Sequence, residues 1–288
     1  AAPSLAQEIA IETFAGPVTL PVQAADARIA VFDLAATDTL SALGVTLSGV
    51  PAFTPPALLA PAMAGVPTIG TLFEPDFEAL AVMAPDLIVA GGRSQRAVDA
   101  LSQIAPTIDM TIYGADLLEQ AEARLTAYGT LFGREAEAAD LVAGLDAQLT
   151  AAREAIAGKG DALILMTNGT SVSAYGDDSR FGWLHSATGL PEAFPAITAE
   201  NHGESVSFEF IAEVNPDWLL VIDRGAAIGQ AGEAAAAVLD NPLVMGTTAG
   251  QQGQIVYLDS AALYLAAGGV QSTGLILDQL TEAFDAAE

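Results

Sequence analysis

The feature that most constrains the fold is a segment that occurs twice in degraded form. One copy spans residues 77–93, and the other spans 208–224 within the longer stretch 202–224. Each copy opens on Phe-Glu, reaches Pro-Asp seven residues after the Glu, continues as an apolar run and ends on Arg fifteen residues after the Glu. The matching residues are Glu78 and Glu209, Pro85-Asp86 and Pro216-Asp217, and Arg93 and Arg224.

Each copy predicts a helix, a turn at Pro-Asp and a buried parallel strand whose carboxyl end carries an Arg. Proline disfavours the helical conformation in the residue before it, so the helix is expected to end there. The runs Leu-Ile-Val and Leu-Leu-Val-Ile are typical of a strand covered on both faces. Two equivalent halves are therefore expected, the alternative being a chance similarity of two helix-to-strand junctions.

The chain of 288 residues has room for two lobes of roughly 120 to 130 residues each. Strand and helix patterns alternate along it, which is typical of an α/β protein with mainly parallel sheets. Residues 134–157 place apolar side chains at helical spacing, over roughly 36 Å, and would join the lobes as one long helix. An ordinary packed helix within one domain is the alternative. We predict an N-terminal lobe with a leading hairpin at 1–132, a connecting helix at 133–158 and a C-terminal lobe at 159–288.

Local patterns give more detailed expectations. Residues 9–13 and 18–22 alternate apolar and polar around Gly16, which predicts a β-hairpin. Thr37 and Asp38 are predicted to cap a helix that continues to Leu43. Residues 168–176 are predicted to form a loop, and residues 226–239 an Ala-rich helix.

The charge excludes whole classes of partner. With 36 acidic and 9 basic residues, the formal charge is −27 at pH 7. Such a chain repels phosphates, which argues against binding to nucleic acid or to an anionic membrane surface. No uncharged apolar run reaches the ~18 residues that a membrane-spanning helix needs, so we expect a soluble, globular protein. Several Arg side chains brought together in so negative a chain would make the electrostatic potential positive at that place.

The absence of cysteine excludes disulfides, thiol nucleophiles and thiolate metal sites, and it is compatible with an oxidising compartment. If the protein is exported, we expect its signal to have been removed before residue 1, and a lipid anchor on the precursor stays open. Catalytic motifs are poorly represented, because no G-x-G-x-x-G loop, phosphate-binding loop or G-x-S-x-G elbow is found. With two His in all, a hydrolase triad has few bases to choose from.

Five side chains are candidate site residues because of their positions in the chain rather than because of their residue types. Taken singly, Arg93, Arg180 and Arg224 would be surface ions, and Tyr264 would be a core aromatic. Two of the Arg fall at equivalent strand ends and one falls in a Ser/Gly loop, so all three are expected to face the space between the lobes. His202 lies in a loop just before the second copy of the repeat, whereas His185 lies in an apolar segment and is expected to be a packed or a surface histidine of a helix.

Three stretches resemble a known family: YGDDSRFG, NHGESVSFEFIAEVNPDWLLVIDR and IVYLDSAALYLAAGG. They are similar to the periplasmic ferric-siderophore-binding proteins of ABC importers, especially the catecholate (enterobactin-type) subgroup. The similarity extends from about residue 28 to the C-terminus. It implies a class III periplasmic binding protein, with two α/β lobes of mainly parallel sheets joined by one long helix and a shallow cleft between them.

The resemblance also implies roles for particular residues. Three Arg of that subgroup meet the anionic catecholate oxygens, and the motif matches place them at Arg93, Arg180 and Arg224. A His and a Tyr complete the iron coordination when the siderophore supplies only four donors, and they would be His202 and Tyr264. Guanidinium groups and hard oxygen donors suit this chemistry. One Glu on each lobe pairs with Arg of the membrane permease, which would assign that role to Glu78 and Glu209.

The predicted function is therefore a monomeric, non-enzymatic periplasmic receptor that binds a ferric catecholate siderophore and delivers it to an ABC permease. No intrinsic cofactor is expected, since Fe(III) arrives as the siderophore complex. Two alternatives stay open. One is a haem receptor of the same architecture, with His202 and Tyr264 as axial ligands. The other is a metal-dependent enzyme or metallochaperone, which two His support poorly.

Overall fold

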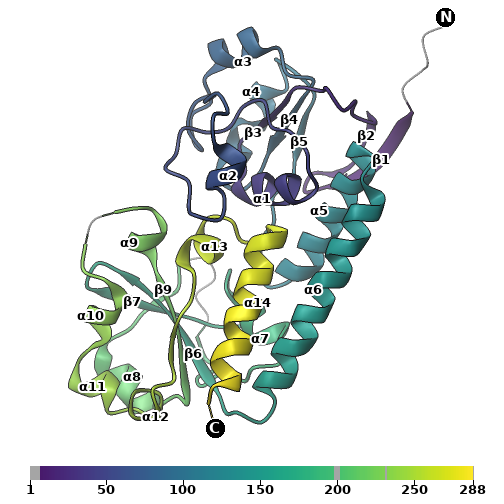
Figure 1. Ribbon diagram of the computed structural model, residues 1–288. Coiled ribbons are helices and arrows are strands. Elements are labelled where there is room, and N and C mark those ends of the chain that lie inside the picture. The colour runs from purple at the N-terminus through teal and green to yellow at the C-terminus, as the bar shows by residue number, and fades with distance from the viewer. Residues whose placement is uncertain (1–6, 198–201, 231, 288) are drawn as a thin grey trace, which may run out of the picture. The chain divides into compact units, whose positions relative to one another are not determined.

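The structure is a computed structural model that describes residues 7–197, 202–230 and 232–287. These residues form two compact units (Figure 1). Unit 1 holds the residues up to Ile112, Glu119–Gly144 and Gly268–Gln271, and unit 2 holds Tyr113–Leu118, Leu145–Ala267 and the residues from Ser272 onward. No helix within the described ranges is long and apolar enough to cross a membrane.

The long helix α6 (Glu135–Ile156) begins in unit 1 and continues into unit 2. The α/β class and the long helix predicted from the sequence are confirmed. The division between the units falls inside α6, whereas the sequence pattern treats residues 133–158 as a separate connecting segment. The lobe bounds drawn from the sequence stay a prediction.

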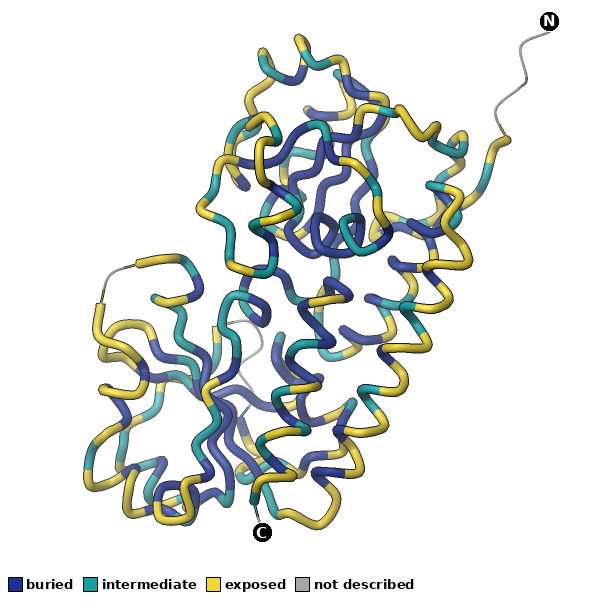
Figure 2. Tube along the Cα trace, viewed as in Figure 1, coloured by how far each residue is buried: buried dark blue, intermediate teal, exposed yellow. Residues whose placement is uncertain are grey.

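Unit 1 is built on a parallel sheet of three short strands, in the order β3-β4-β5. The strands are β3 (Ile29–Val31), β4 (Leu87–Ala90) and β5 (Thr107–Asp109). β3 and β4 are buried along their whole length (Figure 2), as expected for strands covered on both faces. Phe32, Ile69, Leu80 and Leu101 pack into the same core.

A β-hairpin precedes this sheet. β1 (Glu8–Thr13) pairs antiparallel with β2 (Gly16–Pro21), and Thr13 lies opposite Gly16 at the turn. The predicted hairpin is confirmed. Arg124 joins it to the unit, because its Nη1 donates a hydrogen bond to the carbonyl of Glu12 at 3.2 Å.

The helices that begin before residue 120 are α1 (Leu34–Ala42), α2 (Ala60–Met63), α3 (Phe77–Met83), the 3-10 helix η1 (Gly92–Ala97), α4 (Val98–Leu101) and α5 (Leu117–Phe132). The predicted cap of α1 is wrong. Asp33 caps this helix, since its Oδ1 accepts the N–H of Ala36 at 2.7 Å. Thr37 and Asp38 are fully buried inside the helix. The cap therefore lies at Asp33, directly after the buried Phe32 and four residues before Thr37, and the helix starts at Leu34.

Unit 2 is built on a mixed sheet of five strands, in the order β10-β9-β6-β7-β8. The strands are β6 (Ala162–Asn168), β7 (Ser171–Tyr175), β8 (Glu204–Ser205), β9 (Trp218–Asp223) and β10 (Ile255–Tyr257). β10, β9 and β6 are parallel to one another. β7 pairs antiparallel with β6, and β8 pairs antiparallel with β7. The predicted loop at 168–176 is wrong, because Gly169, with φ of 58°, turns the chain and residues 171–175 alternate as a strand.

The helices of this part of the chain are α7 (Trp183–Ser186), α8 (Phe208–Val214), α9 (Arg224–Ala227), α10 (Ala235–Leu239), α11 (Pro242–Met245), α12 (Thr248–Gln252), α13 (Ser260–Tyr264) and α14 (Val270–Asp285). The single helix predicted at 226–239 is wrong. Gly229 has φ of 66° and separates α9 from α10. The Asp223 carboxylate binds both helix starts, at Ala226 N (2.9 Å) and Ala235 N (2.8 Å). Two short capped helices thereby replace a long one.

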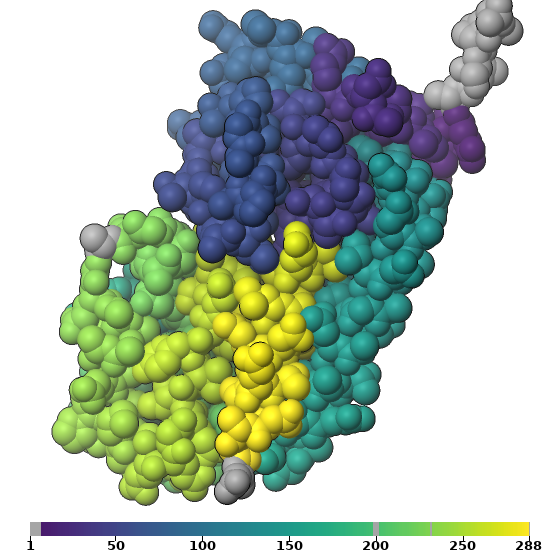
Figure 3. Space-filling model, in the orientation of Figure 1, coloured from purple at the N-terminus to yellow at the C-terminus, as the bar shows by residue number. Residues whose placement is uncertain are grey.

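The C-terminal helix α14 lies beside the second half of α6 (Figure 3). Gln148 of α6 donates a hydrogen bond from Nε2 to Asp278 Oδ2 at 2.9 Å. A Cβ at Gly274 would lie 2.7 Å from the Gln148 side-chain oxygen, so the two helices approach closely here. This contact fixes α14 to the unit 2 part of α6.

The two copies of the sequence repeat share an unusual backbone conformation. α3 ends at Ala84 with φ of 49°, and α8 ends at Asn215 with φ of 50°. Within the described ranges these are the two residues other than glycine with positive φ. Each is followed by Pro-Asp, so the left-handed residue turns the chain from the helix toward the strand.

The Asp of each Pro-Asp pair makes the same long-range contact. Asp86 Oδ2 accepts the backbone N–H of Arg28 at 2.8 Å, directly before β3. Asp217 Oδ2 accepts the backbone N–H of Asp161 at 3.1 Å, directly before β6. The equivalence predicted from the spacing therefore extends to the contacts that join neighbouring parallel strands.

Replacing Ala84 by Gly is expected to stabilise the protein, because glycine adopts the left-handed conformation without steric cost. The expected gain is about 1 kcal/mol in the free energy of unfolding, measured from urea denaturation. Ala79→Gly, inside α3, is the matched control and is expected to cost about 0.5–1 kcal/mol. A lower urea midpoint for Ala84→Gly than for the parent protein would contradict the left-handed cap.

Candidate functional site

Two arginines and one tyrosine meet in unit 2. Arg224 is the first residue of α9, directly after β9, and Tyr264 is the last residue of α13. Arg180 lies between β7 and α7. The Arg180 guanidinium carbon lies 4.6 Å from the centre of the Tyr264 ring, and that of Arg224 lies 5.7 Å from it. Three of the predicted site residues of this unit are therefore in contact.

Hydrogen bonds fix this cluster further. Arg180 Nη2 donates to the carbonyl of Tyr264 at 3.0 Å, and Arg224 Nε donates to the Tyr264 hydroxyl at 3.1 Å. Arg224 Nη1 also donates to Oδ1 of Asn168, the last residue of β6, at 3.2 Å. Guanidinium groups over an aromatic face gain about 0.5–2 kcal/mol, which helps to offset the repulsion between two like charges. The cluster, which we call the Arg-Tyr cluster (Arg180, Arg224 and Tyr264), concentrates positive charge in a very acidic chain.

The environment of the cluster includes residues that the sequence did not single out. Asn168 was predicted only as part of a loop, and its contact with Arg224 depends on the hairpin formed by β6 and β7. Tyr175 packs edge-on against Phe181 at 4.8 Å between ring centres. Burial raises the pKa of Tyr175 to about 12, although Arg180 acts in the opposite direction. Tyr175 therefore stays protonated at neutral pH and serves as a wall rather than as an ionic ligand.

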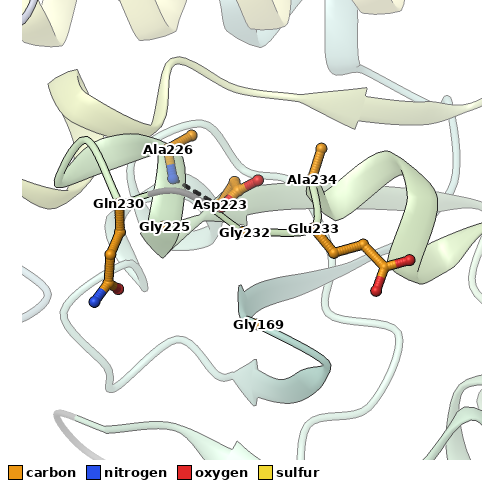
Figure 4. Close-up of a pocket in the computed structure, with 8 residues that line it drawn as sticks. All are labelled: Gly169, Asp223, Gly225, Ala226, Gln230, Gly232, Glu233 and Ala234. Atoms are coloured by element: carbon orange, nitrogen blue, oxygen red, sulfur yellow. Dashed lines mark hydrogen bonds between the residues drawn. The ribbon is translucent and has the colours of Figure 1, made fainter.

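A pocket of about 170 Å³ in unit 2 is shown in Figure 4. It is lined by Gly169, Asp223, Gly225, Ala226, Gln230, Gly232, Glu233 and Ala234. Its residues include the chain neighbours of Asn168 and Arg224, and most of them are small. Figure 4 shows the side chains of Gln230 and Glu233 on either side of Asp223. Asp223 and Glu233 both contribute carboxylates to this pocket, and each Asp223 oxygen accepts one helix N–H.

The remaining predicted residues lie elsewhere. Arg93 belongs to unit 1, where it is half-buried in η1 after β4. His202 is exposed just before β8, next to Gly203 with its positive φ of 69°. Its role as an iron ligand stays a prediction. Within the described part of the chain, no group of three or more His, Asp and Glu side chains converges as a metal site.

Glu78 and Glu209 occupy equivalent, exposed positions in the first turns of α3 and α8. Hydrogen bonds from its own backbone N–H and from the Ser207 side chain lower the pKa of Glu209. Carboxylates at this position also complement the helix dipole. Both groups are therefore accessible anions at the amino ends of equivalent helices, and their docking role stays a prediction.

The sequence matches a known family model. The model, described as "Periplasmic binding protein", matches residues 29–262. Petrobactin-binding protein YclQ of Bacillus subtilis is 34% identical over 264 residues, which cover 90% of this chain and 82% of the relative. Ferric-anguibactin-binding protein FatB of Vibrio anguillarum is 28% identical over 270 residues, with 89% and 82% covered.

Solved structures give the same picture. The crystal structure of YclQ superposes with a TM-score of 0.90 at 30% identity, covering 97% of this chain and 99% of that one. The periplasmic catecholate-siderophore binding protein VctP of Vibrio cholerae gives a TM-score of 0.88 at 33% identity, covering 97% and 100%. Both likenesses extend over nearly the whole chain and confirm the predicted fold class.

His185, the second histidine, is structural. It is buried, and its Nδ1 lies 2.9 Å from the carbonyl oxygen of Leu190. A carbonyl can only accept, so Nδ1 carries the proton. Burial lowers the pKa of His185, although the bond to Leu190 acts in the opposite direction. Of the two positions expected from the sequence, packed or at the surface of a helix, the structure shows the packed one.

The stability of the protein should therefore fall as the pH falls below 6.5, the ordinary pKa of the histidine in the unfolded chain. Below that pH, His185 binds a proton more readily in the unfolded state than in the folded state, so protonation favours unfolding. His185→Gln is expected to remove most of the change in thermal midpoint between pH 7 and pH 5.5. His202→Gln replaces an exposed histidine, and this variant is expected to show the same change in thermal midpoint as the parent protein. Equal pH slopes in the parent protein and His185→Gln would contradict this account.

Proposed function

The chain belongs to the periplasmic binding protein family, and we propose that it is the substrate-binding component of an ABC iron importer. Its ligand is an anionic ferric catecholate siderophore. The observation that carries the proposal is the Arg-Tyr cluster, in which Arg180 and Arg224 are held on one aromatic ring in a chain of formal charge −27. The relatives named above, which bind petrobactin, ferric anguibactin and catecholate siderophores, support the same ligand class.

The chemistry of the cluster suits such a ligand. Catecholate oxygens bound to Fe(III) retain negative charge, and guanidinium groups donate strong charge-assisted hydrogen bonds to oxyanions. Arg93 is proposed to contribute a third guanidinium to the same ligand. Where the siderophore supplies four donors, His202 and Tyr264 are proposed to complete the coordination of its iron, because imidazole and phenolate oxygen both suit Fe(III).

Family membership also suggests a transport partner and a cellular location for this protein. The family and VctP are both described as periplasmic, and we propose a periplasmic, monomeric receptor that delivers its ligand to an inner-membrane permease. Glu78 and Glu209 are the proposed docking groups. Their equivalent positions on α3 and α8 suit a permease that presents two equivalent basic sites. No catalytic step is proposed.

Replacing Arg180 and Arg224 by Ala, singly and together, tests the ligand assignment. Each charge-assisted contact contributes about 1.5–3 kcal/mol, so each single variant should bind a ferric catecholate about tenfold to a hundredfold more weakly. Binding is measured by quenching of intrinsic fluorescence. Arg134→Ala removes an exposed Arg paired with Glu137 and serves as the matched control, with unchanged affinity expected. An unchanged affinity in the double variant, with a parent-like thermal midpoint, would exclude the Arg-Tyr cluster as the site.

Replacing Glu78 and Glu209 by Ala tests docking separately from ligand binding. The affinity for the ferric siderophore is expected to stay unchanged, because both side chains are exposed in the first turns of α3 and α8. Uptake of ⁵⁵Fe-siderophore by cells that depend on this protein should fall, most strongly in the double variant. Glu213→Ala, an exposed carboxylate at the other end of α8, is the control. Normal uptake by the double variant would refute the docking role.

A further inference from the structure

An exposed apolar patch lies next to Glu78 in unit 1. Phe73 is 69% exposed, Phe77 is 43% exposed and Val82 is 88% exposed. Phe77 and Val82 belong to α3, and Phe73 lies in the loop directly before this helix. We call these three side chains the Phe73 patch (Phe73, Phe77 and Val82). A single exposed apolar residue is common on protein surfaces, whereas a group of them on one short segment marks a candidate interaction site.

Hydrogen bonds close the loop that carries Phe73. Thr71 N donates to the carbonyl of Glu74 at 2.8 Å, and Thr71 Oγ1 accepts the N–H groups of Phe73 at 3.2 Å and of Glu74 at 3.0 Å. Gly70 has a φ of 104°, and a Cβ there would collide with the backbone of Glu74. Leu72 is buried, which attaches the loop to unit 1. The loop is therefore fixed in a shape that keeps Phe73 in solvent.

The same segment joins the loop to α3. Asp76 N donates to the carbonyl of Ile69 at 2.9 Å, and Asp76 Oδ1 caps α3 by accepting the N–H of Ala79 at 3.0 Å. Glu78 and Val82 are four residues apart on α3, so they lie on the same face of the helix. The proposed docking carboxylate and the apolar side chains are thus held together by one rigid segment.

The second copy of the repeat shows that the fold does not require this apolar surface. The register of the two copies aligns Val82 with Glu213, and both residues are exposed. Glutamate forms helices more readily than valine does, so helix stability does not account for valine at this position. The docking carboxylates Glu78 and Glu209 are therefore equivalent, whereas the residue one helical turn farther on is apolar in unit 1 and acidic in unit 2.

Charge indicates what covers the patch. Residues 29–92 contain no Lys, Arg or His, and the carboxylates Glu74, Asp76 and Glu78 are exposed on the segment that carries Phe73. In a second copy of this chain the same carboxylates would face one another, and an anionic membrane surface would also be repelled. The surface instead fits a protein that offers an apolar recess bordered by Lys or Arg.

We propose that the Phe73 patch is an apolar anchor that docks on the ABC permease, in a recess whose border carries the basic groups that pair with Glu78. The inference rests on the proposed function, which supplies the permease as partner. Aromatic side chains buried in a pocket of the partner dominate the affinity of many interfaces, whereas an exposed ion pair contributes little. Glu78 then orients unit 1 on the permease, and Phe73 supplies most of the affinity of this contact.

Photocrosslinking in cells tests the partner directly. p-Benzoylphenylalanine in place of Phe73 keeps an aromatic ring at the tip of the loop. Ultraviolet light is expected to join it to an ABC permease subunit, at apolar residues next to Lys or Arg in the peptide that mass spectrometry identifies. The same replacement at Phe14, a 48% exposed residue of the hairpin turn, is the matched control and is expected to give no such product. A crosslinked dimer of this chain, products with lipid or soluble proteins alone, or no product would overturn the proposal.

Two substitutions measure the contribution of the patch to docking. Phe73→Ser removes the aromatic ring, and Val82→Glu introduces the residue that unit 2 carries at the equivalent position. Purified protein loaded with ⁵⁵Fe-siderophore is supplied to spheroplasts that lack their own copy. The protein concentration for half-maximal uptake is expected to rise about tenfold or more in Phe73→Ser, and to rise in Val82→Glu. Phe14→Ser is the control and is expected to leave it unchanged.

Thermal midpoints and affinities for the ferric catecholate are expected to stay at parent values in both patch variants, because the replaced side chains are exposed. A parent-like half-maximal concentration in both variants would overturn the proposal. A protein that binds no catecholate, but whose residue 73 still crosslinks to an ABC permease, would refute only the proposed ligand and support the docking role of the patch.

Discussion

The carboxylate of the Pro-Asp pair is the contact on which both halves of the structure depend. Asp86 and Asp217 each bind the backbone N–H that precedes the first parallel strand of their sheet. This contact joins the chain leaving a helix to the start of the neighbouring strand. In both copies an Arg follows seven residues after the Asp, although β4 ends at Ala90 and β9 ends at Asp223. The position of Arg93 and Arg224 at equivalent strand ends is thus a consequence of one repeated helix–turn–strand unit.

The second constraint is electrostatic. A chain with a formal charge of −27 repels anions at long range, so an anion site needs a local concentration of positive charge. In unit 2 the Tyr264 ring, its carbonyl and hydroxyl, and Asn168 hold two guanidinium groups close to each other. In unit 1 hydrogen bonds from Gly92 to Thr111 and from Gln95 to Asp109 fix the segment around Arg93. The segments that carry the arginines of the two units are thus held by different contacts.

The sequence predicts much of this because the informative residues are local. The spacing from Glu78 to Arg93 and from Glu209 to Arg224 indicates the duplication, and motif resemblance brings Arg180 and Tyr264 into the same hypothesis. The failures are equally physical. Asp223 caps α9 and also binds the first N–H of α10, twelve residues farther along the chain, which local propensity does not reveal. β7 depends on the turn at Gly169, and the contact of Asp33 with Gly91-Gly92 depends on strands far apart in the chain. The periodic pattern of apolar residues predicts local helices and strands, and it does not predict contacts between segments that are distant in the sequence.

The central claim is that the protein binds an anionic ferric catecholate, and a ligand panel tests it most directly. Purified protein is titrated with ferric complexes of a tetradentate and a hexadentate catecholate, with a ferric hydroxamate and with haem, while fluorescence and visible spectra are recorded. We predict tight binding of both catecholates. We also predict that the visible absorption band shifts only for the tetradentate complex, and that His202→Ala abolishes this shift. Binding of haem with a sharp Soret band, or of the hydroxamate, in the absence of catecholate binding would contradict the account.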